Sequence, residues 1–359
     1  MITYRTKSSE INLPPGRLRT VRKIDGRAAI RRVNPDIRGY VQILFLLITL
    51  WIGIEYILFV TQLGTGKPPA ISRPSGVEGF LPISALISFR YFLLTGILNH
   101  IHPSGLVIFF AIIFISTFLK KGFCSWICPV GLISESLHQF GNKIFKRNFQ
   151  LPKLIDIPLR SIKYLLLFFF VYNISLMTVD ELRMFIYSDY NKAADLKLYL
   201  FFANIGTLSV VVIGILIFLS LLIKNFWCRY ACPYGALLGI LSMLSPLKVR
   251  RNDSTCIKCG KCSLACPSYL PVDKLDSVNS AECFSCYSCI EACPVPDTLN
   301  FSISSESKGI SQTQYAIIIT GIYFLIVGFA MMLGYWHSSI SIDEYLTLFK
   351  NIGTINHVF

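Results

Sequence analysis

The chain has 359 residues, of which 53% are hydrophobic and 15% are charged, and its formal net charge is +14. This composition excludes an ordinary soluble protein and indicates an integral membrane protein, because the apolar residues come in long blocks. Lys and Arg beside anionic lipid explain the positive charge, and no nucleic-acid recognition motif accompanies it, so nucleic acid is not an expected partner.

The first 39 residues are polar and basic. They contain no short apolar core of the kind that marks a cleavable signal peptide. We therefore expect residues 1–39 to form a cytoplasmic N-terminal segment, followed by a membrane domain that covers 40–251.

Five apolar blocks are long enough, with their flanking residues, to cross a bilayer core, which takes about 20 residues. A sixth stretch, 79–98, contains Pro82 and Arg90, and we expect it to form an interfacial or re-entrant helix on the outer face. The five predicted spans are 40–63, 105–119, 164–179, 206–223 and 315–336.

The distribution of Lys and Arg orients these spans. The segments 1–39, 120–163 and 224–314 fall on one side and hold 27 of the 34 Lys and Arg residues, which leaves 7 for the other side. Basic loops stay inside, so the rich side should be cytoplasmic. The sequence thus predicts a multi-pass protein in the cytoplasmic membrane of a prokaryote, with its N-terminus inside and its C-terminus outside.

A repeat follows the second and the fourth predicted span. "GFCSWICPVGLI" (122–133) and "FWCRYACPYGALL" (226–238) each contain Cys-x3-Cys-Pro, at an offset of 104 positions (228 minus 124). We call residues 124–129 and 228–233 the two Cys-Pro turns. Two repeated helical hairpins in the same orientation predict a pseudo-two-fold axis along the membrane normal, with the turns facing each other.

Proline prefers the first helical position, so Cys128 and Cys232 should cap the helices that follow, where a helix N-terminus favours thiolate. Together with Cys124 and Cys228 they are candidate ligands of a metal centre, either iron–sulfur, copper or zinc. The alternative is four reduced structural cysteines at a helix crossing. Three aromatic residues nearby are expected to anchor at the membrane interface: Trp126, Trp227 and Tyr230.

The helix after the first turn is expected to be amphipathic and to lie on the inner leaflet, because 130–147 places apolar residues at helical spacing and ends in basic ones. Towards the C-terminus, 298–314 reads as a polar linker, 315–336 as the final membrane helix and 337–359 as an outer tail.

Residues 252–297 form a cysteine-rich domain whose two runs repeat the spacing Cys-x2-Cys-x2-Cys-x3-Cys-Pro. This spacing matches the bacterial two-cluster ferredoxins, in which three cysteines of one run and the fourth of the other hold each 4Fe–4S cluster. Disulfides are disfavoured in a reducing compartment, and zinc sites use separated Cys-x2-Cys pairs. The predicted ligands are Cys256, Cys259, Cys262 and Cys293 for one cluster, and Cys283, Cys286, Cys289 and Cys266 for the other.

Three polar residues are candidates for binding quinone and its protons. Glu55 lies within the first predicted span, and His100 and His102 lie at the outer end of the second. An intramembrane carboxylate is a functional candidate, and histidine suits quinone hydrogen bonding. The alternatives are a glutamate that reaches the outer interface and ordinary interfacial histidines.

The order of these features resembles the membrane-bound polyferredoxins of the NapH, NosR and CcoG group, over roughly residues 38–297. The resemblance rests on 12 cysteines and the four prolines that follow them. It implies an integral-membrane electron carrier that serves a respiratory or metal-handling system. The chain departs from the group because it has no room for the flavin-binding domain of the NosR type and lacks the long C-terminal domain of the CcoG type.

The expected fold is an all-α membrane protein of about five transmembrane helices with a small cytoplasmic ferredoxin-like domain carrying two 4Fe–4S clusters. The expected function is electron transfer between a cytoplasmic or quinone donor and a membrane or extracytoplasmic redox partner. The chain reads as a carrier or oxidoreductase subunit, and no catalytic residue stands out. Two alternatives remain open: a cupric reductase that uses the Cys-Pro thiols, and a redox-sensing or assembly factor.

Overall fold

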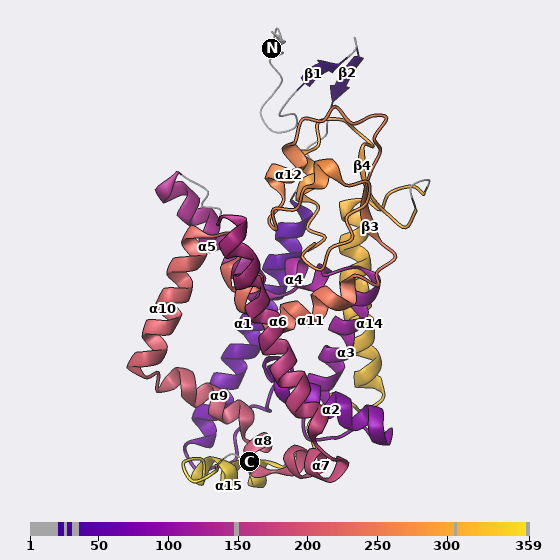
Figure 1. Ribbon diagram of the computed structural model, residues 1–359. Coiled ribbons are helices and arrows are strands. Elements are labelled where there is room, and N and C mark those ends of the chain that lie inside the picture. Colours follow the sequence, from indigo (N-terminus) through magenta and orange to yellow (C-terminus); the bar gives the residue numbers. More distant parts are fainter. Residues whose placement is uncertain (1–20, 25–26, 31–35, 147–150, 305–306, 357–359) are drawn as a thin grey trace.

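The computed structural model describes residues 21–24, 27–30, 36–146, 151–304 and 307–356. Over these residues the protein is a helical body with the cysteine-rich domain, drawn in orange in Figure 1, on one end. The described part of the chain is mostly helical, as the sequence predicts, and its strands form two short antiparallel sheets.

The helices of the body differ widely in length. The long ones are α1 (Ile37–Leu63), α6 (Lys153–Leu176) and α14 (Gln312–Met332). The other elements of the body are the 3-10 helix η1 (Ser75–Phe80), α2 (Pro82–Thr95), α3 (Pro103–Phe118), α4 (Gly122–Trp126), α5 (Pro129–Phe145), α7 (Val179–Tyr187), α8 (Asp189–Lys192), α9 (Ala194–Ala203), α10 (Thr207–Leu222), the π-helical turn η2 (Trp227–Ala231), α11 (Pro233–Ser242) and α15 (Ile342–Lys350).

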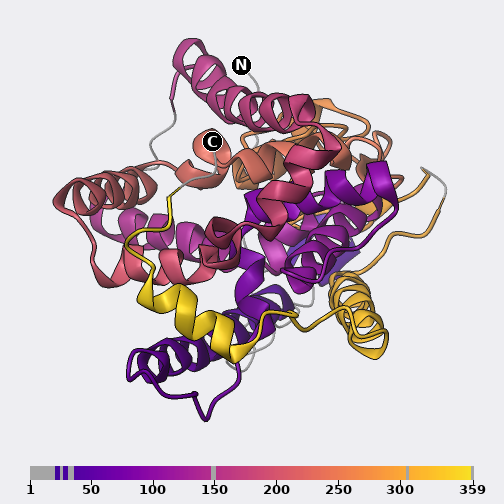
Figure 2. The same ribbon diagram turned by 90° about the horizontal axis from the view of Figure 1, so that it is seen from below.

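Helices α1 and α14 are each long and apolar enough to cross a membrane alone. Two bent pairs, α6 with α7 and α9 with α10, pass the same test only when each pair is taken together, and their bends are 107° and 84°. Seen from below, α10 and α14 lie on opposite sides of the body (Figure 2). The described residues therefore offer two membrane spans, or up to four, where the sequence predicts five.

The predicted span at 105–119 accounts for the difference. It forms α3, which has only 16 residues. Helix α3 lies inside the body, in contact with α2, α11 and α14, and its residues Ala111 and Ile115 are fully buried. Its apolar composition therefore reflects burial among helices, which hydropathy alone does not separate from exposure to lipid.

The stretch 79–98 does not form a spanning helix. Its helix α2 begins with Pro82 at the first helical position and ends at Gly96, whose φ of 71° is left-handed. The helix has 14 residues and packs on α3 and α7. This agrees with the predicted non-spanning helix, and its location on the outer face remains a prediction.

The repeat seen in the sequence is also a repeat of packing. Each Cys-Pro turn connects an apolar helix to a following helix: α3 to α5 in the first unit, and α10 to α11 in the second. Helix α5 packs on α10, and α11 packs on α3. At Gly141 of α5 a side chain would lie 2.0 Å from the Leu221 carbonyl oxygen, so glycine allows that close approach. The helix after each turn thus packs on the apolar helix of the other unit, as a pseudo-two-fold relation requires.

The cysteine-rich domain is closed by a two-stranded sheet. Strand β3 (Lys248–Arg251) precedes the first cysteine run, β4 (Leu299–Ser302) follows the second, and Val249 pairs with Phe301. Between them lie α12 (Lys261–Ala265), the 3-10 turn η3 (Val272–Lys274) and α13 (Ser288–Ala292). The other sheet pairs β1 (Val21–Ile24) with β2 (Arg27–Ile30).

The domain rests directly on the first Cys-Pro turn. The indole Nε1 of Trp126 donates a hydrogen bond to the Ser285 carbonyl oxygen at 3.1 Å, and Ser125 Oγ donates to the Phe284 carbonyl oxygen at 2.6 Å. Trp126 is fully buried and packs on Tyr315 of α14. The prediction that Trp126 anchors at the membrane interface is therefore wrong, because its indole is used to seat the domain.

Candidate metal centres

The eight cysteines of the domain line two separate cavities. Each cavity takes three cysteines from one run and the fourth from the other, which is the crossing that the spacing predicts. Four thiols are the donor set of a 4Fe–4S cluster, so both cavities fit such a group. The surface cavity is lined by Cys256, Cys259, Cys262 and Cys293, and the inner cavity by Cys266, Cys283, Cys286 and Cys289.

The local backbone explains how thiols at every third position face one cavity. In the first run, Lys258 and Gly260 have positive φ values of 51° and 69°. In the second run the equivalent residues, Ser285 and Tyr287, have 47° and 62°. Left-handed residues on both sides of the second cysteine of each run curl the chain back on itself. The two runs therefore form the same loop although only one of these four residues is glycine.

The two cavities differ in exposure. All four cysteines of the inner cavity are buried, whereas Cys259 of the surface cavity is exposed and Cys256 and Cys293 are half-buried. The inner cavity lies against the helical body, where Ser285 accepts the hydrogen bond from Trp126. One site therefore faces solvent and the other faces the body.

A third cavity lies between the cysteine-rich domain and the Cys-Pro turns. We call it the junction cavity, and its lining includes Cys124, Cys228 and Cys286. Arg38 and Glu135 also line it and form an ion pair with each other. Cys286 therefore lines both the inner and the junction cavity.

The predicted caps are confirmed. Cys128 is the N-cap of α5 and Cys232 is the N-cap of α11, each with proline at the first helical position. The Gly235 backbone N–H donates to Cys232 Sγ at 3.3 Å. The four turn thiols are close enough to interact electrostatically. Within the described ranges no three His, Cys, Asp or Glu side chains are grouped as ligands of a single metal ion.

The expectation that a cap favours thiolate is wrong for Cys128 in the protein without metal. Burial raises the pKa of Cys124 to about 12 and that of Cys128 to about 11, and it also raises the pKa of Cys228. The backbone N–H groups of Gly131 and Val130 lower the pKa of Cys128, but burial outweighs them. Deprotonation of these thiols therefore calls for a positive partner such as a metal cation.

Three lysines close to the Cys-Pro turns are fully buried, which the sequence did not reveal. Lys163 Nζ lies 2.7 Å from both carboxylate oxygens of Glu282, and Tyr164 donates to the same carboxylate at 2.9 Å. Lys120 and Lys121 have no hydrogen-bond partner for Nζ among the described residues. In the sequence all three counted only as basic residues on the cytoplasmic side, and no local signal separates them from exposed lysines.

Two family models match this chain. One, described as a 4Fe-4S binding domain, matches residues 101–148 and 205–252, which contain the two Cys-Pro turns. The other, described as a 4Fe-4S dicluster domain, matches residues 248–294. A curated relative, the "Putative electron transport protein YccM" of Escherichia coli, is 41% identical over 326 residues, or 89% of this chain and 91% of the relative.

The chain belongs to the membrane-associated polyferredoxins. The "Ferredoxin-type protein NapH" of Escherichia coli is 26% identical over 41% of this chain and 48% of NapH, and the "Regulatory protein NosR" of Pseudomonas aeruginosa is 28% identical over 36% of this chain and 17% of NosR. No solved structure matches. This polyferredoxin is therefore an iron–sulfur, 4Fe–4S electron-transport protein with helices suited to a membrane.

The three quinone candidates do not form one site. Glu55 is half-buried in α1, without a hydrogen-bond partner in the described part of the chain. His100 is exposed and stacks on Tyr335 with ring centroids 5.4 Å apart. Tyr335 lines an apolar cavity of about 270 Å³ between α3 and α14, together with Asn99. This cavity lies at the start of α3, roughly 22 Å from the helix end that leads to the first Cys-Pro turn.

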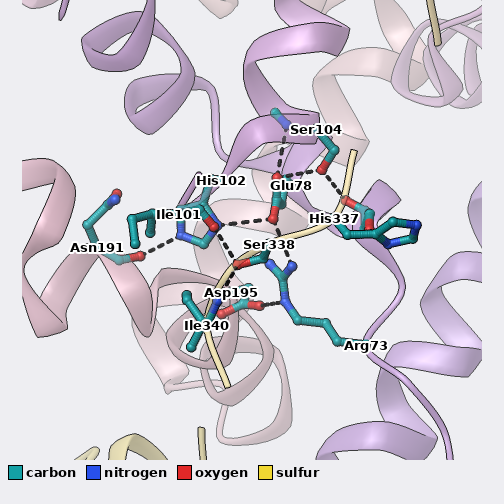
Figure 3. Close-up of polar contacts among 12 residues, drawn as sticks. Arg73, Glu78, Ile101, His102, Ser104, Asn191, Asp195, His337, Ser338 and Ile340 are labelled. Atoms are coloured by element: carbon teal, nitrogen blue, oxygen red, sulfur yellow. Dashed lines mark hydrogen bonds and ion pairs between the residues drawn. The ribbon is translucent and has the colours of Figure 1, made fainter. Parts of the chain in front are cut away.

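His102 instead belongs to a buried polar cluster that the sequence did not predict (Figure 3). Glu78 lies at its centre, with Arg73 Nη1 at 2.7 Å and the Gly105 backbone N–H donating at 3.0 Å. Arg73 Nε also lies 2.6 Å from Asp195. The cluster joins η1, the start of α3 and the α8–α9 region, which are far apart in the sequence.

Both ring nitrogens of His102 face acceptors. Nε2 lies 2.7 Å from the Asn191 carbonyl oxygen, and Nδ1 lies 3.3 Å from Glu78 Oε1. Burial alone would raise the pKa of Glu78, but Arg73 and the hydrogen bonds from His102 and Ser104 outweigh it and lower the pKa to about 2. His102 is therefore committed to a structural ion network rather than free to face a ligand.

Proposed function

We propose that this polyferredoxin carries electrons along a row of three centres, from the surface of the cysteine-rich domain into the helical body. Thiols of the surface and inner cavities would hold two 4Fe–4S clusters, each of which accepts and donates one electron when bound. Cys124, Cys128, Cys228 and Cys232 would hold a third, metal–thiolate centre. The observation that carries the proposal is the position of Cys286, which lines both the inner cavity and the junction cavity, the latter together with Cys124 and Cys228.

The burial of the thiols supports this order. Exposed Cys259 gives the surface cavity access to a soluble partner, while the inner cavity is enclosed by buried side chains. Beside the inner cavity, Tyr287, Trp126 and Tyr315 of α14 pack against one another with centroids 5.2 to 6.2 Å apart, the first two edge to face and the other pairs tilted. These rings exclude water on the side that faces the body. The thiols of the inner cavity would thus lie between the surface cluster and the centre at the Cys-Pro turns, and they do not face solvent.

The proposed orientation puts the cysteine-rich domain on the cytoplasmic side. The starts of α1, α6 and α14 and the end of α10 all lie at the end of the body that carries this domain (Figure 1). The segments that connect there hold most of the Lys and Arg residues. We propose a cytoplasmic donor for the surface site and a membrane or extracytoplasmic acceptor beside the Cys-Pro turns. The cavity lined by Asn99 and Tyr335 is distant from the Cys-Pro turns. A quinone bound there would therefore fit this electron-transfer route less well.

Metal analysis of the full-length chain, purified anaerobically in detergent, tests the proposal. Iron, acid-labile sulfide, copper and zinc are measured per chain. We expect about 8 Fe for the two clusters plus a further redox metal, iron or copper, that is lost in the C124S/C228S variant. C286S should lose the iron of the inner site instead. A wild-type chain with about 8 Fe and no additional metal would contradict the third centre and leave the two-cluster carrier standing.

A further inference from the structure

Lys120 and Lys121 precede the first Cys-Pro turn and place two ammonium groups inside the protein. Both side chains are fully buried, and neither Nζ has a hydrogen-bond partner within the described residues. An ammonium group without a partner in a protein interior costs several kcal/mol. A folded chain keeps such a group only where something compensates for its charge.

The one carboxylate that interacts electrostatically with Lys121, Glu282, forms no hydrogen bond with it and does not compensate all the lysines nearby. Glu282 already binds Lys163 through both carboxylate oxygens and also accepts from Tyr164. The next carboxylate, Asp156, is also committed, since it pairs with Arg229 at 2.9 Å and with Arg160 at 3.0 Å. Three buried lysines therefore share one carboxylate in the described part of this region.

The start of α11 beside Lys121 makes a lone cation there more unfavourable, and the face of the Phe284 ring offsets this only weakly. The Lys121 Nζ lies 4.6 Å from the centroid of the Phe284 ring and 3.5 Å from where a side chain on Gly235 would begin. Gly235 is in the first turn of α11, whose free N–H groups carry partial positive charge. A helix N-terminus and an ammonium group that point at the same space both favour an anion between them.

The turn thiols are the groups that could provide that anion. Lys121 interacts electrostatically with Cys124 and with Cys228, one from each turn. The N–H of Gly235 already donates to Cys232 Sγ. Thiols bound to a metal are thiolates, so a metal centre ligated by all four carries net negative charge.

We propose that Lys121 is the built-in counter-charge of an anionic metal–thiolate centre at the two Cys-Pro turns, and that it stabilises that centre and raises its reduction potential. This inference rests on the proposed third centre. Lys120 has a similar relation to the inner cavity. Its φ of 59° reverses the backbone, and its electrostatic partner is Cys283 of the inner cavity. Cys283 interacts more strongly with Lys120 than with Lys121, so Lys120 would serve mainly the inner centre, whereas Lys121 also interacts with Cys124 and Cys228 of the turns.

The test compares K121M with K120M in the full-length chain, by metal analysis and by potentiometric titration followed by electron paramagnetic resonance. Methionine keeps the length of the side chain and removes the charge. In K121M we expect the centre lost in C124S/C228S to lose occupancy, or its reduced-to-oxidised ratio at a fixed potential to fall about tenfold, a shift of about 59 mV for one electron. K120M should leave that centre unchanged and shift the inner cluster. K121R should restore the wild-type signal.

A second measurement separates this role from a merely structural one. After removal of the metal by a chelator, K121M should be at least as resistant to thermal unfolding as the wild type, because it removes an uncompensated buried charge. If K121M does not accumulate, K121Q takes its place. A third centre with unchanged occupancy and potential in K121M would overturn the inference and leave the proposed function intact. A wild type without a third centre would overturn both.

Discussion

Cys286 of the second cysteine run and Cys124 of the first Cys-Pro turn line the same cavity, although they lie 162 positions apart in the chain (286 minus 124). The contact exists because the domain is seated on the first turn by hydrogen bonds from Ser125 and Trp126. The inner site and the first turn therefore both contribute side chains to the junction cavity.

Replacing Cys286 should interrupt the route between the surface site and the turns. In C286A we expect the iron content to fall by about 4 Fe per chain, because one ligand of the inner cluster is lost. Electrons supplied by a soluble reduced ferredoxin should then reduce the surface cluster alone, followed by electron paramagnetic resonance. C259A is the matched control, since it removes a surface ligand and should spare the inner cluster. Reduction of the turn centre at the wild-type rate in C286A would exclude this order.

Two glycines at equivalent positions of the repeats should respond differently to the same substitution. At Gly131 a new Cβ would lie 2.1 Å from the Cys124 carbonyl oxygen, whereas at Gly235 it would lie 3.4 Å from the Cys228 carbonyl oxygen. G131A should therefore force α5 away from the turn and cost about 1–3 kcal/mol. G235A should be tolerated at its backbone contact. Thermal unfolding in detergent compares the two, and equal stability of both variants would refute the asymmetry.

The buried pair of Lys163 and Glu282 should behave as a coupled unit. K163M leaves a buried carboxylate with only Tyr164 as hydrogen-bond donor, and E282Q leaves a buried ammonium, so each single change should cost about 3–5 kcal/mol. The double variant should cost clearly less than the sum of the two. A double-mutant cycle on thermal unfolding measures the coupling. Additive effects would mean that the two groups do not compensate each other.

Lowering the pH should reduce the stability of the folded protein, because Glu78 has a lowered pKa in the folded chain. Its pKa is about 2 in the folded chain against an ordinary value of 4.5, so below pH 4.5 the unfolded chain binds a proton that the folded chain does not. The stabilisation, roughly 3 kcal/mol, is complete above that range and is lost as the pH falls from 4.5 towards 2. In E78Q the dependence of unfolding on pH should flatten over this interval. A variant with the wild-type slope would show that other groups control the acid transition.

Most of the cysteine positions around the candidate metal centres could be predicted from local spacing in the sequence. The 2-2-3 spacing predicted which four cysteines share each cavity, and the prolines at 129 and 233 predicted the two caps, because both depend on neighbours a few residues apart. What depends on packing was missed. Lys121 reads like any basic residue next to a membrane until α11 is placed against it, and the apolar sequence of α3 does not reveal its burial among α2, α11 and α14.

The pairing of β3 with β4 has a consequence for how such a chain can be assembled over evolution. Lys248 and Ser302 are partners in the sheet, so the polypeptide leaves the helical body and returns to it at the same place. A unit whose two ends meet can be spliced into a loop without stretching the host. The cysteine-rich domain is thus attached as a cassette between α11 and α14, while the paired helices and their turns form a scaffold with its own internal symmetry.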